Sequence, residues 1–270
     1  MSDWGDYRSV TRYAEDDGTA YRTQVNANSV ANTKGSTWTT LFASTPFDAD
    51  SLTLVWTGST GAKTMIYDLG VGIATSEVVL VPNLLSESQS GYLWTKQFQL
   101  PIAVPAGTRL SARGQSNSAS ADNYLKVIIG AGNGTPCQRA TEYGCILGTS
   151  RGTIVQCSGT LNTFGSWYEI TSSTTDAMRM ALFQFESDQN NGVQDVTIQV
   201  GIGGTPGTNN APDTTVLAGI YLVAADATMS QVQCSPLLLP FALPAATRIA
   251  MRGKSSAGGL NVDCSVIGFM

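Results

Sequence analysis

One segment of the chain occurs twice, and this internal repeat constrains the fold more than any other feature of the sequence. LPIAVPAGTRLSARGQS covers residues 100–116, and LPFALPAATRIAMRGKS covers residues 239–255. The two copies align without a gap and share ten of seventeen residues. Such self-similarity indicates a duplicated folding unit, so we expect two domains of one fold in tandem.

The pattern inside the repeated segment predicts a turn followed by a β-strand. Residues 105–107 and 244–246 each begin with proline, which suits the second position of a turn. Apolar and polar residues then alternate over 109–113 and 248–252, which is typical of a strand with one apolar face. The two arginines of each copy should therefore point the same way, about 13 Å apart at about 3.3 Å per residue.

Weaker matches extend the repeat over most of the chain. TQVNANSVANTKGS at 23–36 aligns with TIVQCSGTLNTFGS at 153–166. Strand-like stretches at 51–56, 67–73, 78–81 and 124–130 recur at 178–185, 198–204, 216–223 and 260–269. Each copy thus offers about eight short strands separated by turn-forming residues, a pattern that favours a sandwich. The sequence predicts an all-β protein with two tandem jelly-roll-like β-sandwich domains.

The repeat also sets the expected domain boundaries. We predict an N-terminal arm over 1–20, a first β-sandwich repeat over 21–130, a linker over 131–150 and a second repeat over 151–270. The arm carries Trp4, Tyr7 and Tyr13 and an acidic run at 15–17. It either docks on a neighbouring subunit or frays as a terminus, and the sequence leaves both readings open.

Charge and composition limit the chemistry that the chain can perform. Only 13% of residues are charged and the net charge is −5, so nothing in the charge balance favours binding to nucleic acid or to a membrane. The chain contains no histidine, the usual general base, zinc ligand and pH switch. We find no catalytic constellation, and we expect no enzymatic activity, no cofactor and no metal.

The cysteines are expected to be structural. Five of them occur, an odd number without CxxC spacing, which argues against a disulfide framework and against a zinc site. We expect small buried apolar side chains, although a bridge from Cys137 to Cys145 or from Cys145 to Cys157 remains open. The remaining two cysteines are Cys234 and Cys264.

The repeated arginines allow two interpretations. Arg109 with Arg113, and Arg248 with Arg252, could present guanidinium groups to a carboxylate or phosphate on a partner. Alternatively, they pair with acids on their own sheet, such as Asp122 or Asp263, and so pin the fold. We favour the internal pairing. The four arginines, together with Trp4, Tyr7 and Tyr13, remain the candidate partner contacts.

Two further sets of residues have the composition of a ligand site. Tyr92, Trp94, Trp56 and Trp167 could stack on a sugar ring, but core packing is the commoner role of such aromatics. Acid pairs such as Glu77 with Glu87, or Asp48 with Asp50, have the residue types of a glycosidase. Carboxylates in polar loops are usually only solvated, and the second repeat offers no matching pair.

The phrase VPAGTRLSARGQS, the low charge and the Ser/Thr/Asn/Gly-rich strands resemble virion structural proteins of tailed bacteriophages, of the capsid-decoration or tail kind. The N-terminus also shows neither a basic start nor an apolar run typical of secretion. The resemblance implies a homo-oligomer that is made in the cytoplasm of a bacterial host and binds other virion proteins. The alternative is a carbohydrate-binding, host-adsorption module of a phage particle, with a glycan as ligand.

Overall fold

A computed structural model describes residues 12–15, 23–58, 63–88, 95–121, 123–132, 135–186, 194–224, 232–233 and 236–270. Within these ranges the chain is built of β-strands, and the helical element is one short 3₁₀ helix, η1 (Leu147–Thr149). No helix in the described part is long and apolar enough to cross a membrane.

The first domain is a sandwich of two antiparallel sheets. Sheet I has the order β1-β9-β4-β7, and β2 also pairs with β9. Its strands are β1 (Arg12–Glu15), β2 (Thr23–Gln24), β4 (Ser51–Gly58), β7 (Thr95–Leu100) and β9 (Asn123–Ala131). Sheet II has the order β3-β8-β5-β6 and consists of β3 (Thr39–Phe42), β5 (Lys63–Val71), β6 (Val78–Ser88) and β8 (Leu110–Ser116).

The second domain repeats this arrangement. Sheet III has the order β10-β19-β13-β17, with β11 also on β19, and sheet IV has the order β12-β18-β14-β15-β16. Sheet III consists of β10 (Ala140–Tyr143), β11 (Thr153–Gln156), β13 (Met178–Glu186), β17 (Leu237–Leu243) and β19 (Asn261–Phe269). Sheet IV consists of β12 (Tyr168–Thr171), β14 (Gln194–Ile202), β15 (Thr214–Ala224), β16 (Val232–Gln233) and β18 (Ile249–Ser255).

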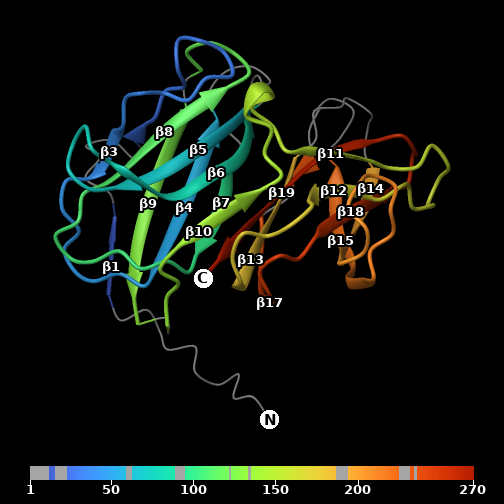
Figure 1. Ribbon diagram of the computed structural model, residues 1–270. Coiled ribbons are helices and arrows are strands. Elements are labelled where there is room, and N and C mark those ends of the chain that lie inside the picture. Colours follow the sequence, from blue (N-terminus) through green and yellow to red (C-terminus); the bar gives the residue numbers. More distant parts are fainter. Residues whose placement is uncertain are drawn as a thin grey trace.

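The strand order confirms the predicted fold class. From β2 to β9 the chain alternates between sheets I and II, except at the β5–β6 hairpin. β11 to β19 follow the same course, with the short β16 added to sheet IV after the β14–β15 hairpin. This is the path of a jelly roll. Figure 1 shows the two sandwiches side by side, the first in blue to green and the second in yellow to red. Alternating apolar residues fill each interior, with Trp56 and Tyr67 in the first core and Phe183 and Phe185 in the second.

The repeated motif folds as predicted, except for the position of its proline. Thr108 N–H donates to the Pro105 carbonyl, so proline takes the first and not the second position of the turn. The third position needs a positive φ, which Gly107 supplies at 75° and Ala246 at 59°. The hydroxyl of Thr45 then donates to the Pro105 carbonyl at 2.6 Å. Thr174 makes the equivalent bond to Pro244 at 3.1 Å in the second domain.

Two segments expected to lie outside the sandwiches carry strands. β1 falls within the predicted arm and pairs with β9, and β10 falls within the predicted linker and pairs with β19. Arm and linker therefore each give their sandwich an outer strand. These four-residue strands offer too few residues for a clear alternation, which is why the sequence pattern did not predict them.

The second sandwich rests on the first through the outer face of sheet III. Along β13 and β19, one set of side chains enters the second core, and the opposite set, which includes Leu182, Ile267 and Phe269, joins the first core. β6 accordingly contacts both β10 and β13. Because sheet III is covered on both faces, β13 and β19 are buried along most of their length, including polar residues such as Gln184 and Ser265.

Candidate functional site

Arg109 and Arg248 each fasten a loop of their own domain. Arg109 pairs with Glu77 and donates to Thr40 Oγ1 from both Nε and Nη2. Arg248 is 3% exposed and pairs with Glu169 at 3.0 Å. Its guanidinium also donates to the carbonyls of Gly203, Gly207 and Asn210, and so organises the loop between β14 and β15.

Arg113 and Arg252 lie on the outer faces of sheets II and IV. Arg113 Nε donates to Asp68 Oδ2 at 2.9 Å, and its guanidinium lies 4.5 Å from the centre of the Trp38 ring. In the second domain Arg252 Nε donates to Gln199 Oε1 on β14 at 2.8 Å, and its guanidinium lies 4.6 Å from the centre of the Trp167 ring. In the second domain an amide thus replaces the carboxylate.

The favoured interpretation, that the arginines bind groups of their own domain, agrees with these contacts, but the acids differ from those expected. Asp263 pairs with Arg151 at 2.9 Å instead, and Asp122 lies outside the described residues. Sequence alternation cannot identify such partners, because register between strands decides which side chains face each other. Whether the arginines also contact another protein stays a prediction.

Some of the candidate aromatic residues lie outside the described part of the chain, and the others are buried. Trp4, Tyr7, Tyr92 and Trp94 lie outside the described residues, and for Tyr13 the backbone is described as part of β1. Trp56 and Trp167 are 1% and 7% exposed. Neither ring is therefore free to stack on a sugar, and the core interpretation holds for both.

The described cysteines agree with the prediction of buried side chains that form no disulfide. Cys137, Cys157 and Cys264 are buried thiols, Cys145 is half-buried, and none of these four forms a disulfide. Cys234 lies outside the described residues.

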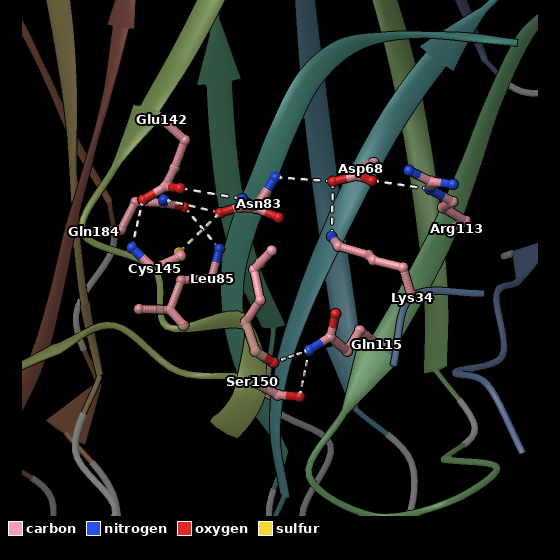
Figure 2. A network of polar contacts seen from close by, with 11 residues as sticks. Lys34, Asp68, Asn83, Leu85, Arg113, Gln115, Glu142, Cys145, Ser150 and Gln184 are labelled. Carbon is pink, nitrogen blue, oxygen red and sulfur yellow. Dashed lines mark hydrogen bonds and ion pairs between the residues drawn. The ribbon is translucent and has the colours of Figure 1, made fainter. Parts of the chain in front are cut away.

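Among the described residues, an extended set of buried polar contacts joins the two domains, and Figure 2 shows it from close by. Asp68 lies at its centre on β5. Its carboxylate binds Lys34 Nζ at 2.7 Å and Arg113 Nε at 2.9 Å, and it accepts the Asn83 N–H at 3.0 Å. Asn83 sits on β6 with a positive φ of 50°, and its amide side chain extends toward Glu142 of the second domain.

The second domain completes this junction network with residues around β10 and β13. Asn83 Nδ2 donates to Glu142 Oε2 at 3.1 Å, and Glu142 Oε1 accepts the Cys145 N–H at 2.6 Å. Gln184 accepts the Leu85 N–H at 2.8 Å and donates to the Asn83 carbonyl at 3.3 Å. The side chains thus satisfy backbone groups that β6 does not use for pairing.

A second group of contacts seals the junction near η1. Gln115 Nε2 on β8 donates to the Leu147 carbonyl and, at 3.1 Å, to Ser150 Oγ. Ser150 in turn donates to Asn32 Oδ1 at 2.8 Å. Farther along the interface, Lys96 of β7 forms an ion pair with Glu186 of β13.

Burial and charge act against each other in the network. Burial by itself would raise the pKa of Asp68, but Lys34, Asn83 and Arg113 outweigh it and hold that pKa below the ordinary value. Burial lowers the pKa of Lys34 in spite of Asp68 and raises the pKa of Glu142 in spite of its two hydrogen bonds.

Chemically, the junction network is suited to holding two domains together. Burial and the neighbouring Glu142 carboxylate raise the pKa of Cys145 well above its usual value, which disfavours the reactive thiolate. No group of three or more metal-ligating side chains occurs among the described residues. Of the acids in the candidate glycosidase pairs, Glu77 forms an ion pair with Arg109, and Asp48 accepts the Ala106 N–H at 2.7 Å.

The sequence did not single out the residues of this network. Asn83 and Glu142 lie outside the repeated segments, and the bond from Gln184 to the Asn83 carbonyl joins residues 101 positions apart. The repeat offers one signal, because Asp68 occupies the position of Gln199, so one copy carries a charge that the other lacks.

The assignment of the fold depends on the strand order described above, because the comparisons with known proteins found only distant structural similarity. No protein-family model and no curated protein matches the chain. The crystal structure of the STIV MCP aligns over 96% of both chains with 7% identity and a TM-score of 0.33. The N-terminal CBM22-1-CBM22-2 tandem domain from Paenibacillus barcinonensis Xyn10C aligns over 96% of this chain and 91% of its own, with 13% identity and a TM-score of 0.27.

A third solved structure is the T13 IBDV viral particle, with 11% identity and a TM-score of 0.23 over 96% of this chain and 69% of its own. TM-scores this low carry no argument about what the chain does.

Proposed function

We propose that the protein is a structural component of a tailed-bacteriophage virion, on the capsid surface or in the tail. There it assembles with other virion proteins through the faces of its sandwiches and through its N-terminal arm, and it catalyses no reaction. The resemblance of the repeated segment to phage structural proteins supports a location in the virion. The domain junction supports a structural role for a rigid two-domain unit.

The observation that supports a rigid two-domain unit is the burial of the outer face of sheet III. Leu182, Ile267 and Phe269 are fully buried there, and Gln184 spans the junction with hydrogen bonds in both directions. Two sandwiches fixed in this way form one stiff body, since a buried apolar and hydrogen-bonded interface resists relative motion. A stiff body with several sheet faces suits assembly into a particle.

The test is made on purified virions of the phage whose genome carries this sequence. We expect quantitative mass spectrometry to find the chain in fixed stoichiometry to the major head or tail proteins. Cryo-electron microscopy should then show paired sandwiches on the head or along the tail. Intact virions that lack the chain would contradict the proposal.

The carbohydrate-binding alternative now depends on Tyr92 and Trp94, because Trp56 and Trp167 are buried. A glycan array with the full chain and with Trp94→Ala tests it. Binding that is lost in Trp94→Ala would favour the adsorption module, and no binding by the unmodified chain would remove it.

A further inference from the structure

The hairpin between β5 and β6 presents apolar side chains to the solvent at its tip. Ile73, Val78 and Val79 are 75%, 68% and 39% exposed. We call these three residues the apolar tip. Single exposed apolar side chains are ordinary on a protein surface, whereas several at one place are typical of an interaction site.

The position of these residues in the strand does not explain why they are apolar, because the second domain has polar residues at the same positions. The strand registers align Val78 with Thr214 and Val79 with Thr215. Both threonines are exposed as well. Valine and threonine have nearly the same shape and both favour a strand. The hairpin could therefore form equally well without the valines.

The apolar tip is held in one conformation. The Ser76 N–H donates to the Ile73 carbonyl at 3.1 Å and closes the turn, and the Gly72 N–H donates to the Arg109 carbonyl at 3.3 Å. Glu77 also forms an ion pair with Arg109. A surface element that is already ordered loses less conformational entropy when it binds a partner.

The second sandwich has an incompletely buried core on the side formed by β15 and β17. Four apolar residues there pack on the second core but are only half-buried: Leu217, Leu237, Leu239 and Phe241. The equivalent residues of the first domain are at most 1% exposed: Val81, Phe98, Leu100 and Ile102. We call the four residues of the second domain the open side.

The first domain shows what kind of surface covers such a side. Leu182, Ile267 and Phe269 of sheet III belong to the same apolar cluster as Phe98 and Leu100. Large apolar side chains on a neighbouring β-structure thus complete the first core. We expect the open side of the second domain to bind a surface of the same chemistry.

The apolar tip has this chemistry, and a second copy of the chain can supply it. The tip and the open side are both exposed in the same chain, so they do not meet within it. They also belong to different domains, and in each case the equivalent part of the other domain is polar or covered. One copy therefore offers a tip to a second copy and an open side to a third.

We propose that the apolar tip of one copy docks against the open side of the second domain of another copy. The contact joins two different surfaces, so it closes into a ring or continues as a filament, depending on the rotation per copy. The inference deepens the proposed assembly role and rests on it for its biological setting.

The experiment measures association of the purified full chain by sedimentation over a concentration series. We expect masses above that of one chain, and association should persist at high salt because salt screens charges and not apolar contacts. I73T/V78T/V79T gives the tip the residue type that stands at 214 and 215. This variant should raise the dissociation constant by about tenfold or more.

A variant of the open side allows a mixing test. Leu237→Lys brings an ammonium group to the open side while its aliphatic stem still packs on the core, and it should weaken association as much. Each variant alone keeps one half of the contact. An equimolar mixture of Leu237→Lys and I73T/V78T/V79T should therefore form pairs of chains and nothing larger, and a mixture that remains monomeric would contradict the proposed contact.

Controls separate lost docking from lost folding. V30T/L161T makes the same kind of change at exposed apolar residues outside the hairpin, and it should leave association unchanged. Ala242→Lys, at an exposed position next to Phe241, serves as the variant that leaves the core intact. Thermal melts confirm that each variant folds. A chain that is monomeric at every concentration, or a folded I73T/V78T/V79T that associates like the unmodified chain, would overturn the inference.

These outcomes are distinct from those that test the virion role. A monomeric chain that is nevertheless found in virions would remove the contact between tip and open side and leave the proposed function standing. An oligomer that depends on the apolar tip but is missing from virions would do the reverse.

Discussion

Asp68 shows how one buried carboxylate can organise residues from distant parts of the chain. It binds Lys34, Arg113 and the backbone of Asn83, and its side chain is 4% exposed. Removing one member of such a buried group leaves uncompensated charge, which costs far more than the group contributes when complete. The two cations therefore depend on this carboxylate.

We predict that Asp68→Asn lowers the free energy of unfolding by about 3 kcal/mol at neutral pH. The pKa of Asp68 is below its ordinary value of 3.8 in the folded state, so its contribution is present above that value and is lost as pH falls through the folded pKa. The gap between the unmodified chain and Asp68→Asn should therefore close in acid, as measured by urea unfolding at a series of pH values.

Asp176→Asn is the matched control for that measurement. Asp176 pairs with Arg139, whose side chain is 61% exposed, so the loss should stay below about 1 kcal/mol. An equal gap between the unmodified chain and Asp68→Asn at all pH values would show that Asp68 does not act through its charge.

At the scale of elements, the turn before β8 and β18 is the best-matched feature of the two repeats. Thr45 and Thr174 fix it with equivalent hydrogen bonds, and the third turn residue has a positive φ in both copies. The copies differ in that Gly107 stands where the second domain has Ala246, and a side chain there is strained.

We predict opposite effects for exchanging these two residues. Gly107→Ala should destabilise the protein by about 1 kcal/mol, because alanine disfavours the left-handed region and no atom lies within 4 Å to compensate. Ala246→Gly should stabilise it by about 0.5 kcal/mol, since relief of strain exceeds the entropy that glycine costs. Thermal melts of both variants check this, and shifts of the same sign would contradict it.

On the scale of the whole molecule, the junction makes the two sandwiches one body. Gln184 is fully buried and bonds to Leu85, Asn83 and Ser265. It therefore links the first domain to the core strands of the second. A buried network with all its groups bonded rigidifies an interface, and a partly satisfied one destabilises it.

We predict that Gln184→Ala costs about 2–5 kcal/mol and uncouples the domains. The change opens a cavity and leaves the Leu85 N–H without its acceptor. Calorimetry should show one transition for the unmodified chain and a split or broadened one for the variant. Gln156→Ala, an exposed position on β11 of the same domain, should leave the transition almost unchanged, and an unsplit, unshifted melt of Gln184→Ala would refute the coupling.

The amino-acid sequence by itself determined the duplication, the all-β class and most strands. β4, β13, β8 and β18 lie where alternation predicts them, because a period of two is a local property of each strand. It also favoured internal partners for the arginines, because the pairs recur at one place in both copies.

Only the tertiary structure decided which residues meet. Arg113 binds Asp68, and Asn83 meets Glu142 and Gln184, because strand register and the packing of one sandwich on the other bring them together. The same packing buries Asp68 and Gln115 on the outer face of sheet II, whereas the equivalent Gln199 and Lys254 on sheet IV are only half-buried. Two nearly identical motifs therefore have different surroundings, and such contacts cannot be read from local pattern because they arise between segments far apart in the chain.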